Sequence, residues 1–220
     1  GRNVNGVLKG AVNVNMLGGT VNTEPASTPT LASDIKNVVF GGGYGEPTIV
    51  EGNIAVTIGT QAATPDNSKP TVYGSVYGGS ALGKVQVSED TGTDLLDNKI
   101  DVNLYDGTIY GNVFGGGLGQ EASAESVQSA IEARVGGNVN VLLDGAKLNC
   151  TFTGEGVNRM PLTGQIFGAN NLNGSPKGHV KVHVKRTVDS AKDDEVDRDD
   201  RPVVTPPATY GYDVAAVYGG

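Results

Sequence analysis

The chain has 220 residues, and 34 of them are glycine, about twice the usual share. These glycines do not recur at every third position, which excludes a collagen triple helix. The chain carries 24 acidic and 16 basic residues, and the resulting net charge of −8 argues against nucleic acid and anionic lipid as main partners. The length is sufficient for one hydrophobic core, so we predict a single domain over residues 1–220.

The first recurring element is a short segment in which apolar and polar residues alternate. It occurs at residues 10–16, 52–58, 99–104, 137–143 and 178–184. Alternation with a period of two predicts β-strands with one buried face. Alignment of these segments predicts a ladder of stacked side chains formed by Val56, Val102, Val141 and Val182.

Two shorter elements follow each alternating segment. The first is a short apolar piece at residues 71–74, 108–111 and 161–164 and, more loosely, at 212–215. The second, here called the aromatic-glycine motif, reads Val-Phe-Gly-Gly or a close variant at residues 39–42, 76–79, 113–116, 166–169 and 217–220. A repeated unit of this kind cannot bury its apolar face alone and must stack on its own copies. We therefore predict an all-β fold, a right-handed parallel β-helix (β-solenoid) with about five coils and three short strands per coil.

Insertions separate these elements at residues 59–70, 88–98, 120–135 and 185–209. They leave near the ends of the predicted strands, so we expect them on the flanks of the molecule. Within one of them, residues 122–133 place Val127 four residues before Ile131 among good helix formers, and Gly136 follows as a candidate C-cap. This segment predicts one short helical insertion of two or three turns.

The succession Val-Phe-Gly-Gly-Gly or Val-Tyr-Gly-Gly, then Gly-Asn-x-x-Val-x-Val, then x-Ile-Tyr-Gly resembles the Gly-rich β-solenoid repeats of large cell-surface proteins of Gram-negative gut bacteria. The resemblance covers nearly the whole chain, and such proteins are described as adhesins. It implies a structural or adhesive segment, extracellular or anchored in the outer membrane, with host or bacterial surface glycans or proteins as partners. We therefore expect a stacked β-solenoid that displays its insertion loops for interaction. The shared residues are corner glycines and core valines, so no catalytic or binding residue is carried over from the family.

The chain begins inside one repeat and stops inside an aromatic-glycine motif, without a segment that would cap an open sheet. We therefore expect a piece of a longer protein, in contact with flanking repeats of the same chain. No signal peptide or membrane span is visible, so we expect no direct membrane insertion by this piece.

Polar residues on the outward face of the alternating segments are the candidate binding residues: Asp101, Asn103, Asn138 and Asn140. Their side chains can hydrogen-bond sugar hydroxyls, which makes a carbohydrate-binding module the first alternative. The motif aromatics allow two interpretations, since they can stack on sugar rings or on one another. We favour a stacked aromatic ladder that shields the glycine backbone.

A polysaccharide lyase or glycosidase is the second alternative. Glycoside hydrolysis usually needs two carboxylates about 5 to 9.5 Å apart. Among the outward positions of the alternating segments only Asp101 is acidic, while Asp106 and Asp144 each precede a glycine and first indicate turns. We therefore predict no catalytic residues, no cofactor and no enzymatic activity.

An acidic run at residues 189–201 is the remaining candidate site, and Asp193, Asp197 and Asp199 are its weak metal-ligand candidates. Ca²⁺ takes six to eight oxygen ligands, but the spacing here does not match an EF-hand loop with its central glycine. We interpret the run as solvated charge and predict no metal site.

Overall fold

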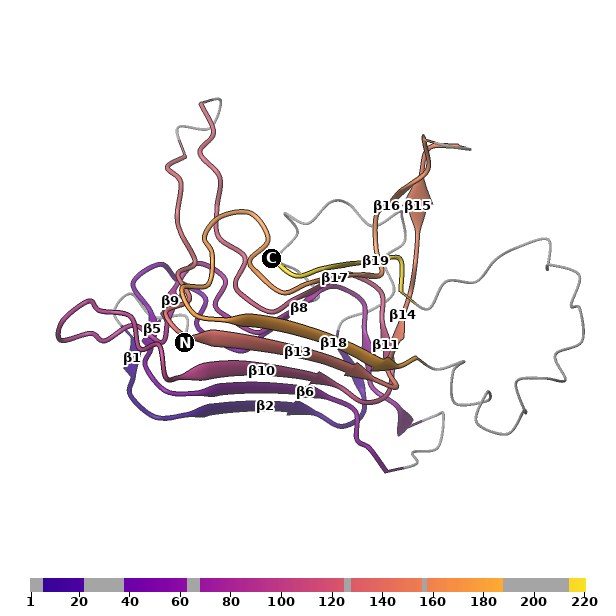
Figure 1. Cartoon of the computed structure of the whole chain (residues 1–220), viewed down its shortest axis with the longest axis horizontal. Helices are drawn as coiled ribbons and strands as arrows, with labels where there is room; N and C mark the ends of the chain where they lie inside the picture. The colour runs from indigo at the N-terminus through magenta and orange to yellow at the C-terminus, as the bar shows by residue number, and fades with distance from the viewer. Residues whose placement is uncertain (1–5, 22–37, 63–67, 125–127, 156–157, 188–213) are drawn as a thin grey trace, which may run out of the picture.

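The computed structural model describes residues 6–21, 38–62, 68–124, 128–155, 158–187 and 214–220 (Figure 1). In these ranges the chain is all-β, with no α-helix and with most strands arranged in parallel sheets. The all-β prediction is confirmed, and the arrangement is compatible with a β-solenoid. The same ranges contain no helix long and apolar enough to cross a bilayer.

The longest strands are the alternating segments, and they form one parallel sheet. Its strands lie side by side in chain order: β2 (Val12–Met16), β6 (Ile54–Ile58), β10 (Lys99–Leu104), β13 (Asn138–Asp144) and β18 (Val180–Arg186). Val102 pairs with Val56 on one side and Val141 on the other, and Val141 pairs with Val182. This is the register that the sequence predicted.

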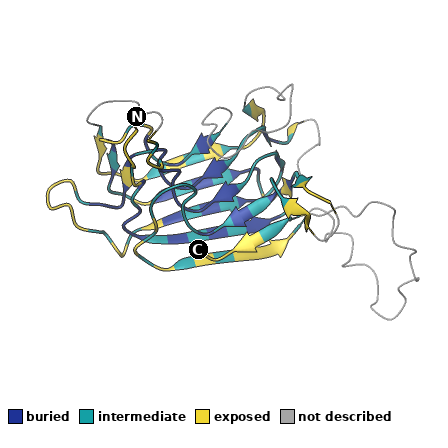
Figure 2. Ribbon diagram, turned by 90° about the horizontal axis from the view of Figure 1, so that it is seen from above, coloured by how far each residue is buried: buried dark blue, intermediate teal, exposed yellow. Residues whose placement is uncertain are grey.

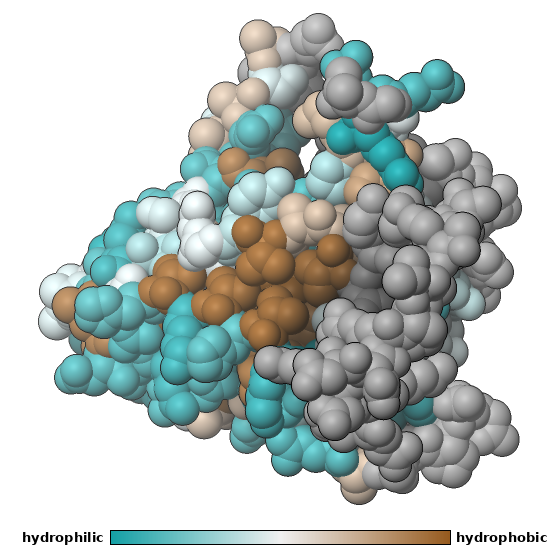
Figure 3. Space-filling model, turned by 45° about the vertical axis from the view of Figure 1, so that its right-hand side comes forward, coloured by the Kyte–Doolittle hydropathy of each residue, from teal (hydrophilic) through white to brown (hydrophobic). Residues whose placement is uncertain are grey.

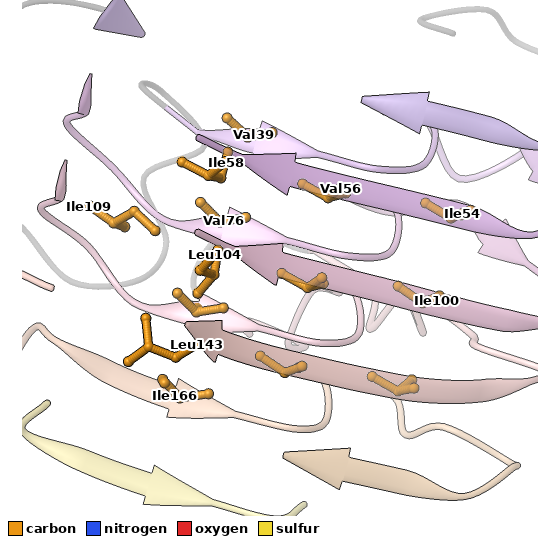
Figure 4. Packing of buried hydrophobic residues seen from close by; sticks show 14 of the residues in the cluster. Val39, Ile54, Val56, Ile58, Val76, Ile100, Leu104, Ile109, Leu143 and Ile166 are labelled. Atoms are coloured by element: carbon orange, nitrogen blue, oxygen red, sulfur yellow. The ribbon is translucent and has the colours of Figure 1, made fainter. Parts of the chain in front are cut away.

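The aromatic-glycine motifs form a second parallel sheet, again in chain order: β4 (Val39–Phe40), β8 (Val76–Tyr77), β12 (Val113–Phe114), β17 (Gln165–Phe167) and β19 (Ala216–Tyr218). A third holds β3 (Thr20–Val21), β7 (Thr71–Val72), β11 (Thr108–Ile109) and β14 (Lys147–Leu148). Their inward aliphatic side chains pack with those of the longest strands in one core cluster, as Figure 4 shows for Leu104, Ile109 and Val76.

The assignment of residues 161–164 to the third sheet was wrong. β11 pairs with β14, while β16 (Met160–Pro161) pairs antiparallel with β15 (Phe152–Thr153) in a projecting hairpin. An Asp-Gly corner precedes both strands of this pair: Asp144-Gly145 precedes β14, and Asp106-Gly107 precedes β11. Residues 161–164, just before the fourth aromatic-glycine motif, resemble the short strand of the third sheet in sequence, but they follow an insertion.

A further parallel sheet was not predicted. It contains β1 (Val7–Leu8), β5 (Ile49–Val50) and β9 (Lys84–Val85), and isolated bridges extend it through Val135 to Pro176. The repeats therefore carry a fourth short strand position in addition to the predicted three. In β1 and β5 the sequence signal is a pair of apolar residues shortly before the glycine that opens an alternating segment, as in Val7-Leu8-Lys9-Gly10, whereas β9 lacks this signal.

The predicted helix at residues 122–133 is also wrong. Gln120 bridges Ile131 and Ser123 bridges Gln128, both antiparallel, so the segment is a narrow arm that leaves and returns at one place. The arm's base is tied to neighbouring repeats, because the Gly119 amide donates to the Ala81 carbonyl and the Ala133 amide to the Asn173 carbonyl. A two-turn helix without an apolar surface to pack on is marginal in water, whereas adjacent ends favour a hairpin-like arm.

Candidate functional site

The outward face of the five-stranded sheet holds the four predicted binding residues, and it brings two of them together. Asn140 on β13 lies beside Asp101 on β10, and its Nδ2 donates a 2.8 Å hydrogen bond to Asp101 Oδ1. Lys99 Nζ lies 2.8 Å from the other carboxylate oxygen of Asp101. The amide and the carboxylate therefore bind each other and a lysine, which leaves less of their hydrogen-bonding capacity for a ligand.

Asn138 has a structural role at the start of β13. Its Nδ2 donates to the carbonyl oxygen of Leu96 at 2.7 Å, and its Oδ1 accepts a hydrogen bond from the amide of His179 at 2.8 Å. Asn53, the equivalent residue of an earlier repeat, accepts in the same way from the amide of Lys99 at 2.8 Å. These asparagines join the start of one strand to the start of the next.

Asn103 is the remaining predicted binding residue. It lies on β10 between Thr57 of β6 and Leu142 of β13, and it is half-buried. Within the described ranges, its side chain makes no hydrogen bond to protein. Of the four candidates, Asn103 therefore has the most hydrogen-bonding capacity left for a ligand. Its two neighbours across the sheet add one further polar group, the hydroxyl of Thr57, because Leu142 is apolar.

The aromatic residues of the motifs form the predicted ladder. Successive rings stack with centroids 4.7 to 4.9 Å apart and interplanar angles of 7° to 20°, in the order Phe40, Tyr77, Phe114, Phe167 and Tyr218. Leu118 and Leu172 pack against the ladder, and Tyr77 and Phe114 are each 2% exposed. The rings of Tyr77 and Phe114 are therefore closed to a sugar, and the predicted stacking of the motif aromatics on one another is confirmed.

Tyr77 brings a polar hydroxyl group into the buried part of this ladder. Asn171 Nδ2 donates to it at 2.9 Å. Burial raises the pKa of Tyr77 to about 12, against a smaller opposing effect of its hydrogen bonds with Asn171 and Ser75. The phenol is thus a protonated core group that ties the ladder to the segment covering it.

The corner carboxylates considered for the enzyme alternative are in ion pairs. Asp106 lies 3.3 Å from Lys69, and Asp144 lies 3.2 Å from Lys185 and 3.4 Å from Arg186. The side chain of Asp144 is only 6% exposed. Both residues lie at Asp-Gly corners, as the turn interpretation predicts, and their carboxylates pair with lysine or arginine side chains of neighbouring repeats.

The metal-ligand candidates Asp193, Asp197 and Asp199 lie outside the described residues. Within the described ranges, no group of three or more histidine, cysteine or acidic residues has the geometry to hold a metal ion.

Three segments project from the sheets: residues 88–97, residues 120–131 apart from 125–127, and residues 151–162 apart from 156–157. The first two lie in insertions that the sequence predicted and that were expected to be displayed for interaction. The third was not predicted as an insertion. Figure 1 shows the 120–131 arm and the β15–β16 hairpin rising from the same side of the molecule. Leu96 is 54% exposed and Met160 is 64% exposed. In the hairpin, the Arg159 guanidinium lies 4.0 Å above the Phe152 ring. The projecting segments therefore present large apolar and cationic groups to solvent.

The 88–97 segment is held against the sheets by charge. Arg134 donates two hydrogen bonds to Asp94, of 2.9 and 2.8 Å, and Lys9 lies 3.2 Å from Asp90. The hydrogen bond to Asp94 and, to a smaller extent, the charge of Asp94 raise the pKa of Arg134 above its ordinary value, so this guanidinium stays charged. Exposed Leu96 is thus presented by a segment with fixed ends.

Comparisons with models of known protein families, with curated proteins and with solved structures found no match for this chain.

Proposed function

We propose that this chain is a right-handed parallel β-solenoid of about five coils, and that it serves as a structural and adhesive segment of a bacterial cell-surface protein. Successive repeats add one strand to each sheet in chain order, which is the connectivity a solenoid needs. The resemblance of its repeats to those of bacterial surface adhesins supports the location and the role. In this proposal the sheets form the stalk, and the projecting segments make the contacts.

The observation that carries the adhesive role is a contrast between two surfaces. On the outward sheet face, Asn138 and Asn140 are bonded within the protein. On the projecting segments, Leu96 and Met160 are more than half exposed. Met, Arg and aromatic residues, such as Met160, Arg159 and Phe152 of the hairpin, are enriched at surfaces that bind another protein.

Attachment of coated beads to cells tests this proposal. Beads carrying the purified chain are incubated with cultured epithelial cells, intact or treated with protease or with glycosidases. The decisive variant replaces residues 121–130 and 152–161 with short Gly/Ser turns and also carries Leu96→Ser, so that all three projecting segments are altered. Each turn can close because Gln120 lies beside Ile131 and Thr151 lies beside Leu162. We expect the wild-type chain to attach and this variant to lose attachment.

The matched control carries Asn103→Ala and Asn140→Ala on the outward sheet face. We expect it to attach like the wild type. If the control loses attachment and binding to a glycan array while the projecting-segment variant keeps both, the carbohydrate-binding module replaces the present proposal. If wild-type beads do not attach to any of the cell preparations, the adhesive role is wrong.

A further inference from the structure

Most backbone contacts in the stack of sheets join one repeat to the next. We number the repeats by their aromatic-glycine motifs, so that Tyr77 lies in the second repeat, Phe114 in the third and Phe167 in the fourth. The Gly78 amide donates to the Phe114 carbonyl. In the same way, the Gly115 amide donates to the Phe167 carbonyl. A stack that is held by such contacts alone can open at one interface at a time.

The apolar core sets the main cost of opening such an interface. Figure 2 shows buried residues along the middle strands of the longest sheet, where Val102 and Val141 are at most 1% exposed. Apolar side chains also gather in one area of the surface (Figure 3), and Val184 of β18 is 44% exposed. Separating two of the middle repeats would uncover side chains that are now buried between them.

The segment that follows the fourth motif lies over the aromatic ladder. The Asn171 amide donates to the Gly117 carbonyl at 3.0 Å. The Leu172 amide donates to the Leu118 carbonyl at 2.7 Å, and both leucines pack against the ladder. These backbone bonds again join neighbouring repeats, the third and the fourth.

One side-chain contact of this segment skips a repeat. Asn171 Nδ2 donates to the Tyr77 hydroxyl at 2.9 Å, although the two residues are 94 positions apart in the sequence. The third repeat lies between them, since the Phe114 ring stacks on Tyr77 on one side and on Phe167 on the other. At the position of Asn171 the third repeat has Gly117, so it contributes no side chain there.

The aromatic ladder itself does not need the Tyr77 hydroxyl. Phe40, Phe114 and Phe167 occupy equivalent positions without a hydroxyl, and their rings stack at similar spacing. Tyr77 is only 2% exposed, and a polar group buried at such a place is costly unless it is hydrogen-bonded. Asn171 provides a hydrogen bond from two repeats away. The hydroxyl therefore serves a contact between repeats that do not touch through their strands.

We propose that the hydrogen bond between Asn171 and Tyr77 is a lock across three repeats. It breaks when the second repeat separates from the third, and it also breaks when the third separates from the fourth. The lock adds its free energy to two interfaces at once and favours opening of the three repeats as one unit. This inference goes beyond the adhesive role, because it gives a stalk of stacked sheets a middle section that resists separation.

Native-state hydrogen exchange of single backbone amides tests the lock, under conditions where the rate follows the opening equilibrium. The amides of Gly41, Gly78 and Gly115 each donate to the next repeat, so they report on three successive interfaces. Tyr77→Phe keeps the ring and removes the hydroxyl. We expect the Gly115 amide to exchange about fivefold faster in this variant, which corresponds to about 1 kcal/mol, although Tyr77 does not line that interface. Gly41 should not change.

Asn171→Ala gives the reciprocal test. The Gly78 amide should exchange about fivefold faster, although Asn171 does not line the interface between the second and third repeats. In the Asn171→Ala background, adding Tyr77→Phe should have no further effect on Gly115, as expected for two residues that act through one bond.

Tyr73→Phe is the matched control. It removes a phenol hydroxyl from the same repeat, and that hydroxyl bonds to none of the described residues. It should leave the Gly41, Gly78 and Gly115 amides unchanged. The proposal is overturned if Tyr77→Phe leaves Gly115 unchanged, if it accelerates all three amides equally, or if the effects of the two lock substitutions add. Hydrogen exchange involves no cells, so failure of the lock and failure of the adhesive role are separate results.

Discussion

Val102 in β10 and Met160 in β16 are both apolar, yet Val102 is fully buried and Met160 is 64% exposed. Val102 has an equivalent valine on each side, Val56 and Val141. Met160 instead belongs to a hairpin that has no counterpart in the neighbouring repeats among the described residues. Burial in this protein thus follows from repetition, since a side chain is covered where the neighbouring repeats supply its counterpart. The effect of a substitution should therefore depend on its place in the stack.

The largest effect is expected for Val102→Asp. It would bury a carboxylate between Val56 and Val141 with no partner, at a cost of several kcal/mol in the free energy of unfolding. Thermal melting followed by circular dichroism should show a large drop in melting temperature or no cooperative transition. Asn103→Asp, on the outward face of the same strand, is the control and should melt close to wild type. If Val102→Asp also melts like wild type, the stacked-core account of β10 is wrong.

The next largest effect is expected for Gly115→Val. The same motif position also occurs at Gly219, where no following repeat packs against it in this chain. In Gly115→Val the new side chain would meet the Gly168 carbonyl and the methyl groups of Val139 and Val141. The resulting strain should exceed the gain of about 0.4–1 kcal/mol that a stiffer unfolded chain brings. Gly219→Val is the matched control and should not be destabilised, because no atom lies within 4 Å of a Cβ built there. Equal melting of the two variants would contradict close approach as the reason for these glycines.

The register of the longest sheet was predictable because the alternation in each segment shows which residues point inward. Aligning the inward residues of five similar segments leaves one register. Strands of two residues carry no such periodicity. The sheet of β1, β5 and β9 was therefore missed, and residues 161–164 were mistaken for the strand that Lys147 and Leu148 form. The helix prediction failed because helix propensity depends on the local sequence alone. It contains no information that Gln120 and Ile131, at the two ends of the segment, lie side by side.

The candidate site was predicted less completely than the fold. Alternation correctly placed Asn103, Asn138 and Asn140 outward, but it contained no information on their partners in other repeats. The bond from Asn138 to Leu96 depends on the course of an insertion, and the contact of Asn140 with Asp101 depends on which residue occupies the facing position. The exposed apolar groups of the projecting segments lie in insertions, where no repeat serves as a guide.

An intermediate effect is expected where a side chain joins two repeats without being in the core. Asn138→Ala removes the hydrogen bonds with the Leu96 carbonyl and the His179 amide. A typical net contribution is about 1 kcal/mol per hydrogen bond, so urea denaturation should give a loss of about 1–2 kcal/mol. Asn103→Ala is the control and should change the free energy of unfolding by less. If Asn103→Ala lost more free energy of unfolding than Asn138→Ala, Asn103 would be the structural residue and Asn138 the one free to bind a ligand.

The smallest effect is expected when the hairpin that carries Met160 is removed. Residues 152–161 are replaced by a short Gly/Ser turn, which keeps Thr151 and Leu162, whose backbones are hydrogen-bonded to each other. The hairpin contributes an exposed Met160 and a cation–π contact between Arg159 and Phe152 but no residue of the core cluster, and shortening a surface loop changes the closure entropy little. The melting temperature should stay close to that of the wild type, whereas attachment to cells should fall. A marked drop in melting temperature would mean that the hairpin supports the stack, and the division between a stalk of sheets and segments that make contacts would then not hold at this repeat.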